Sequence, residues 1–122
     1  MKSITHLGKT LPEGSIDYPK PERLIKGNPK RSTHPFFAST HGDMDVGIWQ
    51  CEVGAWKIAF ADDTDEFFSL IEGCVHLHDE SGHVTEILPG EAAVIPSGFH
   101  GIFEVISPVK KHYVFVKRNK EV

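Results

Sequence analysis

Acidic side chains are concentrated in one short stretch of the sequence, Asp62-Asp63-Thr64-Asp65-Glu66. A carboxyl group held in an apolar pocket can act as a general acid or base. We therefore predict Glu66 as a catalytic general acid or base, with Asp62 assisting it. The alternative is that both carboxylates are structural. A calcium loop is excluded, because the stretch lacks the central glycine and the distal glutamate of such loops.

Two histidines, His76 and His78, are two residues apart and so share one face of a predicted strand with Cys74. The two imidazoles could bind a transition metal. The intervening Val75 and Leu77, however, are the natural core residues of that strand. We therefore expect the histidines to point outward, toward solvent or a partner subunit, and we predict no metal-binding residues.

Short strands are the elements that would position these side chains. From residue 46 onward, apolar alternation is interrupted by turn residues, which is typical of a β-sandwich or jelly roll. We predict strands at residues 46–53, 56–61, 66–71, 74–78, 84–88, 92–95, 102–106 and 111–117. The stretch 54–73 is predicted to form a hairpin with the acidic residues at its corner.

Residues 1–45 have a different composition, rich in Pro, Gly, Lys, Ser and Thr and with little apolar periodicity. We interpret them as an N-terminal arm in the same domain as a barrel formed by residues 46–122. Within this arm, residues 21–27 predict one short helical turn, and residues 28–35 predict a loop.

Period-two alternation separates an inward row of side chains from an outward row. The inward row is mostly aromatic, which is the general form of a small-molecule site next to the predicted catalytic carboxylate. We predict ligand-binding side chains at Trp56, Ile58, Phe60, Phe68 and Phe103. The alternative is that these side chains are simply the hydrophobic core.

Glycine and proline residues recur at spacings that resemble the paired motifs of the cupin family. In the first motif, Gly54 precedes Glu66, and Gly73 follows after six further residues. In the second, five residues separate Gly90 from Pro96-Ser97-Gly98. The resemblance implies an all-β fold, the double-stranded β-helix or RmlC-like jelly-roll barrel, with an N-terminal arm.

The local sequences Asp65-Glu66-Phe67-Phe68 and Val109-Lys110-Lys111-His112-Tyr113 are similar to small single-domain cupins of the ureidoglycine aminohydrolase and EutQ branch. Most members of that branch have no assigned activity. The resemblance implies a small metabolite, nitrogenous by analogy, bound in the barrel mouth. The competing interpretations are an enzyme that uses Glu66, a non-catalytic binding or accessory module, and a purely structural assembly partner.

The resemblance also locates the four metal ligands that many cupins carry, three histidines and a glutamate. These positions fall on Phe60, Asp62, Glu66 and Gly101, so only the glutamate is kept. We therefore predict no cofactor and disfavour a divalent transition metal. His100 precedes the last position and is expected at the rim or surface, because alternation turns it away from the interior.

Composition narrows the class of partner. The chain has 122 residues and a formal charge of −4, which disfavours nucleic acid and anionic membrane as partners. No apolar run approaches the ~20 residues that span a bilayer, and no secretory signal is evident, so we expect a cytoplasmic protein. Cys51 and Cys74 are expected to be reduced thiols. Exposed sheet edges and the arm favour a homodimer.

Overall fold

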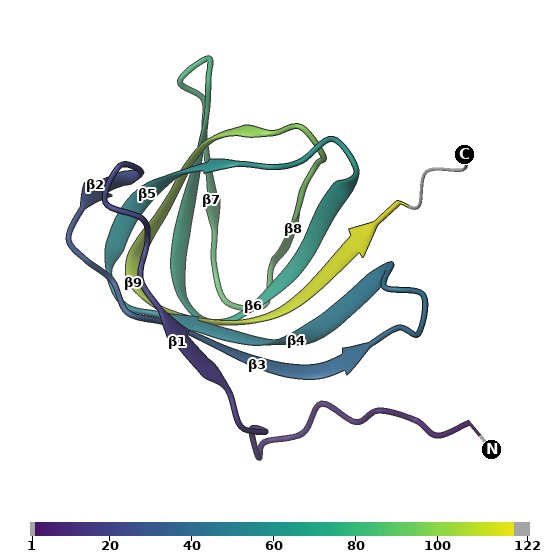
Figure 1. Cartoon of the computed structure of the whole chain (residues 1–122). Coiled ribbons are helices and arrows are strands. Elements are labelled where there is room, and N and C mark those ends of the chain that lie inside the picture. Colours follow the sequence, from purple (N-terminus) through teal and green to yellow (C-terminus); the bar gives the residue numbers. More distant parts are fainter. Residues whose placement is uncertain (1, 119–122) are drawn as a thin grey trace.

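The computed structural model describes residues 2–118, and within them the chain forms nine β-strands and no helix. All strand pairs are antiparallel. Figure 1 shows the strands curling into an open barrel, so the predicted all-β jelly-roll fold is confirmed. The strands are β1 (Ser15–Asp17), β2 (Leu24–Lys26), β3 (Arg31–Ala38), β4 (Met44–Cys51), β5 (Gly54–Ala59), β6 (Thr64–Asp79), β7 (Val84–Ile87), β8 (Ala92–Ile95) and β9 (His100–Lys117).

Two long strands, β6 with 16 residues and β9 with 18, connect the two walls of the barrel. The first half of β6 pairs with the second half of β9, as in Glu66↔Phe115. The second half of β6 pairs with the first half of β9, as in Val75↔Val105. The first wall contains β1, β3, β4, β9, β6 and β8, and the second wall contains β2, β5, β9, β6 and β7.

The bend between the walls is located at Gly73. The register between β6 and β9 shifts on both sides of this residue, and its φ of +92° is a conformation that L side chains rarely adopt. A Cβ atom here would also collide with the carbonyl oxygens of Ser107 and Pro108. Glycine thus lets two strands approach closely while β6 passes from one wall to the other.

The structure corrects several predicted elements. The hairpin at 54–73 is wrong, because β5 pairs with β2 and β9 whereas β6 pairs with β7, β8 and β9. The predicted strands at 66–71 and 74–78 are one strand, β6, and those at 102–106 and 111–117 are one strand, β9. In each case pairing between distant segments overrides the local turn signals.

The N-terminal segment is also more ordered into strands than its composition indicates. The predicted loop at 28–35 is wrong from Arg31 onward, because β3 pairs along β4 from Arg31↔Cys51 to Ala38↔Asp45. Pro35 masks this strand in the sequence, and it is accommodated beside a register shift. Of the helical turn predicted at 21–27, only a hydrogen-bonded turn at residues 20–24 forms, and the rest is wrong because the chain continues directly into β2.

The division into an arm (1–45) and a barrel (46–122) stays a prediction, and Met1 and residues 119–122 lie outside the described part of the chain. In the described residues, no helix is long and apolar enough to cross a membrane.

Side chains from both walls meet in one hydrophobic core. Phe68 and Val75 on β6 are fully buried, and Val105 on β9 is 1% exposed. Burying one such side chain stabilises a fold by about 1.5–3 kcal/mol. The core therefore holds β6 and β9 rigidly and fixes the side chains that alternate with it.

Candidate functional site

A cavity of about 470 Å³ lies between the walls, within the range of small-molecule sites. Its lining is mostly apolar and aromatic, with a few polar groups. The lining comes from β3, β4, β5, β6, β8, β9 and the segment after β5: Thr33, Pro35, Phe37, Asp45, Trp49, Trp56, Ile58, Phe60, Glu66, Ile95, Phe103, Lys111, Tyr113 and Phe115.

Two oppositely charged side chains are buried in this lining. Glu66 and Lys111 are each 4% exposed, and the Lys111 Nζ donates a hydrogen bond of 2.8 Å to the Glu66 Oε2. Removing a carboxylate and an ammonium from water is costly unless they are paired, so each group requires the other. The pair places a fixed acceptor and a fixed donor inside an apolar cavity.

Aromatic rings surround the ammonium group of Lys111. Its Nζ lies 4.4 Å from the ring centroid of Phe68, 4.5 Å from that of Trp49 and 4.9 Å from that of Phe103. A cation over the face of an aromatic ring is attracted by the negative potential of that face. These rings therefore provide favourable contacts to an ammonium group that has little contact with water.

The rings also hold one another in place. Phe103 stacks on Trp56 with centroids 5.2 Å apart and meets Trp49 edge-on at 5.6 Å. Offset and edge-to-face pairs of this kind are worth about 0.5–1.5 kcal/mol beyond the area they bury. The wall around Lys111 is therefore a packed aromatic cluster contributed by β4, β5, β6 and β9.

Alternation along β6 and β9 directs the ion pair inward. Glu66 precedes the buried Phe68 by two residues, and Lys111 lies between the buried Val109 and Tyr113 on β9. Lys111 is opposite Leu70 in the ladder, four residues along β6 from Glu66. Its long side chain therefore has to extend along the barrel interior to reach the carboxylate.

Tyr113 is the next residue of β9 that faces the cavity after Lys111. Burial raises the pKa of its hydroxyl, and the carboxylates of Asp45 and Glu66 raise it further. The ring of Phe115 lies 5.6 Å from the Tyr113 ring. Tyr113 is therefore a neutral hydroxyl at neutral pH that can donate or accept a hydrogen bond in the cavity.

The structure brings together most of the side chains that the sequence indicated. Trp56, Ile58, Phe60, Phe103 and Glu66 all line the cavity, as the alternation predicts. Their roles in binding or catalysis stay predictions.

Two of the predicted site residues lie elsewhere. Phe68 is fully buried and contacts the cavity through Lys111, without belonging to the lining. Asp62 is exposed in the loop between β5 and β6, so the expectation that it faces inward beside Glu66 is wrong. The strand alternation ends at Ala59, before Asp62, and a loop residue does not follow it.

Sequence reasoning missed Lys111, Trp49 and Tyr113. The signal for Lys111 was present, because Val109 and Tyr113 share its face of β9. Lysine is rarely buried, and here the carboxylate of Glu66 and the surrounding aromatic rings, which lie on other strands, explain its position. Trp49 could not be assigned to one face of β4 from the sequence, because apolar residues occupy both faces of that strand, as Ile48 and Trp49 show.

The barrel interior does not fit the metal centre that the cupin resemblance implies. Glu66 already pairs with the ammonium of Lys111, and Phe60 contributes a ring where a histidine would stand. At Gly101 even a Cβ atom would collide with the carbonyl oxygen of His78, so a histidine cannot be placed there without moving β6. The carboxylates of the lining are thus Glu66, which is bound to a cation of the chain itself, and the exposed Asp45, and the lining contains no histidine.

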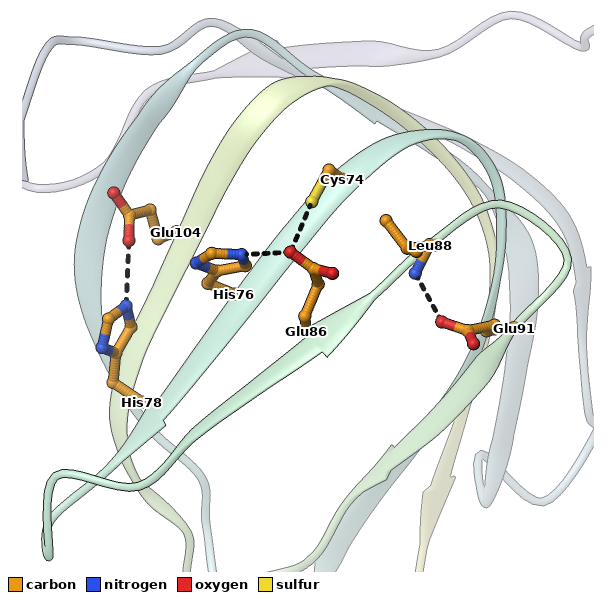
Figure 2. A network of polar contacts seen from close by, with 7 residues as sticks. All are labelled: Cys74, His76, His78, Glu86, Leu88, Glu91 and Glu104. Atoms are coloured by element: carbon orange, nitrogen blue, oxygen red, sulfur yellow. Dashed lines mark hydrogen bonds and ion pairs between the residues drawn. The ribbon is translucent and has the colours of Figure 1, made fainter.

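The remaining histidines and cysteines lie outside the cavity. Val75 and Leu77 enter the core, so His76 and His78 lie on the outer face of β6, as predicted (Figure 2). His100 is exposed, which is also as predicted.

Both cysteines are free thiols. Burial raises the pKa of Cys51 to about 12, so this thiol is uncharged and unreactive at neutral pH. Burial and the carboxylate of Glu86 also raise the pKa of Cys74.

Comparison with known proteins identifies related sequences and folds. The EutQ-like cupin domain model matches residues 38–113 of this chain. A DUF861-family protein of unknown function from Pseudomonas syringae pv. tomato has a TM-score of 0.75 at 23% identity, over 88% of this chain and 45% of its own. The EutQ protein of Clostridium difficile has a TM-score of 0.64 at 18% identity, over 75% of this chain and 65% of its own.

A putative ethanolamine utilization protein Q from Salmonella typhimurium LT2 gives a TM-score of 0.64 at 17% identity, over 90% of this chain and 99% of its own. At these identities the structural likeness shows the fold alone. This chain spans less than two thirds of the Pseudomonas and Clostridium proteins. A search of curated proteins gives no match to the sequence.

Proposed function

Because this chain belongs to the EutQ-like cupin family, we propose that its barrel cavity binds a small metabolite, with the buried Glu66–Lys111 pair as the polar anchor. The buried pair is the single observation that carries this proposal. An ion pair inside an apolar cavity contributes little net stability compared with apolar residues of similar volume. Such a pair is more easily explained by a ligand that it serves.

The hydrogen-bonding groups of Glu66 and Lys111 indicate which groups a ligand would carry. The Glu66 carboxylate accepts hydrogen bonds from N–H groups, and the Lys111 ammonium donates to carbonyl or carboxylate oxygens. A compound that carries an N–H beside a C=O, such as an amide or a ureide, matches both. The aromatic lining would cover the flat faces of such a group. A nitrogenous metabolite therefore suits this cavity.

Glu66 is also the group that would perform chemistry. A carboxylate within reach of a bound N–H or C–H can remove a proton from it. The Lys111 ammonium would hold the Glu66 carboxylate in position and stabilise its negative charge. This reaction would need no metal, since the chain supplies the cation. The second candidate is a non-catalytic module that binds the same ligand, which the tight pairing of Glu66 with Lys111 favours.

Replacement of Glu66 by Gln tests the proposal. We expect a panel of amides, ureides and amines to include compounds that raise the Tm of the wild-type protein and of Glu72→Gln. Glu72 is an exposed carboxylate on the same strand and serves as the matched control. The Glu66→Gln variant should bind these compounds about tenfold or more weakly, because it loses a charged acceptor.

The outcomes separate the candidates. Turnover of a bound compound by the wild type that is lost in Glu66→Gln supports an enzyme, and binding without turnover supports a module. If no compound of the panel binds, or if Glu66→Gln binds as tightly as the wild type, the anchor role is wrong.

A cytoplasmic homodimer is part of this proposal. Free cysteines at positions 51 and 74 suit a reducing compartment. Short edge strands such as β1 and β2 leave unpaired backbone groups that a second copy could use. Sedimentation equilibrium should then give twice the chain mass of 13.6 kDa, and a monomer mass would contradict the dimer.

A further inference from the structure

A second group of chemically active side chains lies on the outer face of the second wall. Figure 2 shows Cys74, His76 and His78 on β6 beside Glu86 of β7, with Glu104 of β9 on the other side. We call these five residues the outer cluster. None of them lines the cavity.

The strand register explains why these residues meet. His76 is directly opposite Glu86 on β7 and directly opposite Glu104 on β9. Cys74 and His78 lie two residues before and after it on the same face of β6. His76 therefore lies between two carboxylates on the neighbouring strands, and between a thiol and an imidazole on its own strand.

Two sets of three ligand atoms, which share His76, are each close enough together to bind one ion. Those of Cys74, His76 and Glu86 all lie within 4.8 Å of one another, and so do those of His76, His78 and Glu104. The His76 Nε2 is 2.9 Å from the Glu86 Oε2, and the His78 Nε2 is 2.9 Å from the Glu104 Oε1. Ligands of tetrahedral zinc are separated by about 3.3–3.7 Å, so small side-chain rotations would admit an ion.

All five residues of the outer cluster lie on strands that also contribute side chains to the core. Val75 and Leu77, which alternate with the cluster, are buried in the core and hold β6 in place. The imidazoles of His76 and His78 are each 28% exposed, so they are open to solvent and to an incoming ion. A site built on strands keeps its geometry better than one on loops.

We propose that the outer cluster is a binding site for a divalent transition metal, zinc by its ligand types, with His76 as the shared ligand. Imidazole, thiolate and carboxylate are the ligands that Zn²⁺ takes in proteins. Cys74 with Glu86 completes the site on one side of His76, and His78 with Glu104 completes it on the other. The bound ion would join β6 to β7 or to β9.

A zinc-binding measurement tests the site with the protein free of tag and metal. We expect competition with a chromophoric chelator at pH 7.5 to give one Zn²⁺ per chain for the wild type. The His76→Asn variant should bind Zn²⁺ about tenfold or more weakly, because it loses the shared ligand. His100→Asn serves as the matched control, since this histidine is exposed and outside the cluster, and its affinity should equal that of the wild type.

Two further variants keep the result interpretable. Glu86→Gln and Glu104→Gln retain the shape of each side chain, and their Tm without metal should stay close to that of the wild type. Weaker zinc binding by either variant supports the site and identifies the strand that supplies the oxygen. The site is wrong if the wild type binds less than one equivalent, if His76→Asn binds like the wild type, or if neither glutamine variant is weakened.

Discussion

Lys111 is the residue on which the interior depends most, because it is the one cation paired with Glu66 in the described part of the barrel. Its ammonium is held by one carboxylate and three aromatic rings. Breaking a buried ion pair costs more than removing both partners, since a single charge is left without a partner in an apolar environment.

Replacement of Lys111 by Met should therefore lower the free energy of unfolding by about 3–5 kcal/mol. The double variant Glu66→Leu/Lys111→Met should recover most of this loss, because no unpaired charge remains. Urea unfolding at pH 7 measures both. Lys110→Met is the matched control on the opposite face of β9, and we expect it to change stability by less than about 0.5 kcal/mol. A Lys111→Met variant as stable as Lys110→Met would contradict the energetic role of the pair.

Among the strands, β6 and β9 carry the architecture, because each contributes to both walls. Their continuity depends on the bend at Gly73. The positive φ of this residue and the crowding by Ser107 and Pro108 act together, so a side chain here would be penalised twice.

Substitution of Gly73 by Ala should lower the free energy of unfolding by more than about 2 kcal/mol or prevent folding. Gly82→Ala separates the two penalties, because Gly82 has a φ of +89° with open space around its Cβ position. We expect the Gly82 variant to lose only about 1 kcal/mol. Equal losses for the two variants in thermal or urea unfolding would show that crowding at the bend is not important.

The same strands show which features the sequence can predict. The alternation correctly placed Trp56, Phe60 and Phe103 toward the cavity, because a buried face selects apolar residues locally. The predicted hairpin is wrong because β9, which begins far beyond β5 in the chain, lies between β5 and β6 and pairs with both. Pairing over such separations leaves no local signal. The predicted inward orientation of Asp62 is wrong because strand alternation does not extend into the loop after β5.

At the scale of the whole molecule, the N-terminal segment contributes strands to the barrel, because β1 and β3 belong to its first wall. Thr33, Pro35 and Phe37 of β3 line the cavity, and β3 covers one edge of β4. Without β3, the apolar lining on that side would be open to water. The segment therefore contributes to the cavity that we propose as the binding site.

Deletion of residues 1–38 should abolish cooperative thermal unfolding and increase binding of an apolar fluorescent dye, because it exposes both the edge of β4 and the cavity. Deletion of residues 1–9 is the control, since residues 2–9 form no strand. We expect the shorter deletion to keep the Tm of the full chain within a few degrees. A 39–122 fragment that unfolds as cooperatively as the full chain would mean that β3 is dispensable.

The pairing of Glu66 with Lys111 also has a consequence for how this protein would respond to its surroundings. A cation that is covalently part of the chain cannot be stripped by chelators, replaced by a competing ion or changed in oxidation state. Depletion or excess of iron, manganese or zinc would therefore leave the Glu66–Lys111 pair in place. A ligand anchored by this pair, as we propose, would thus need no metal ion at its anchor.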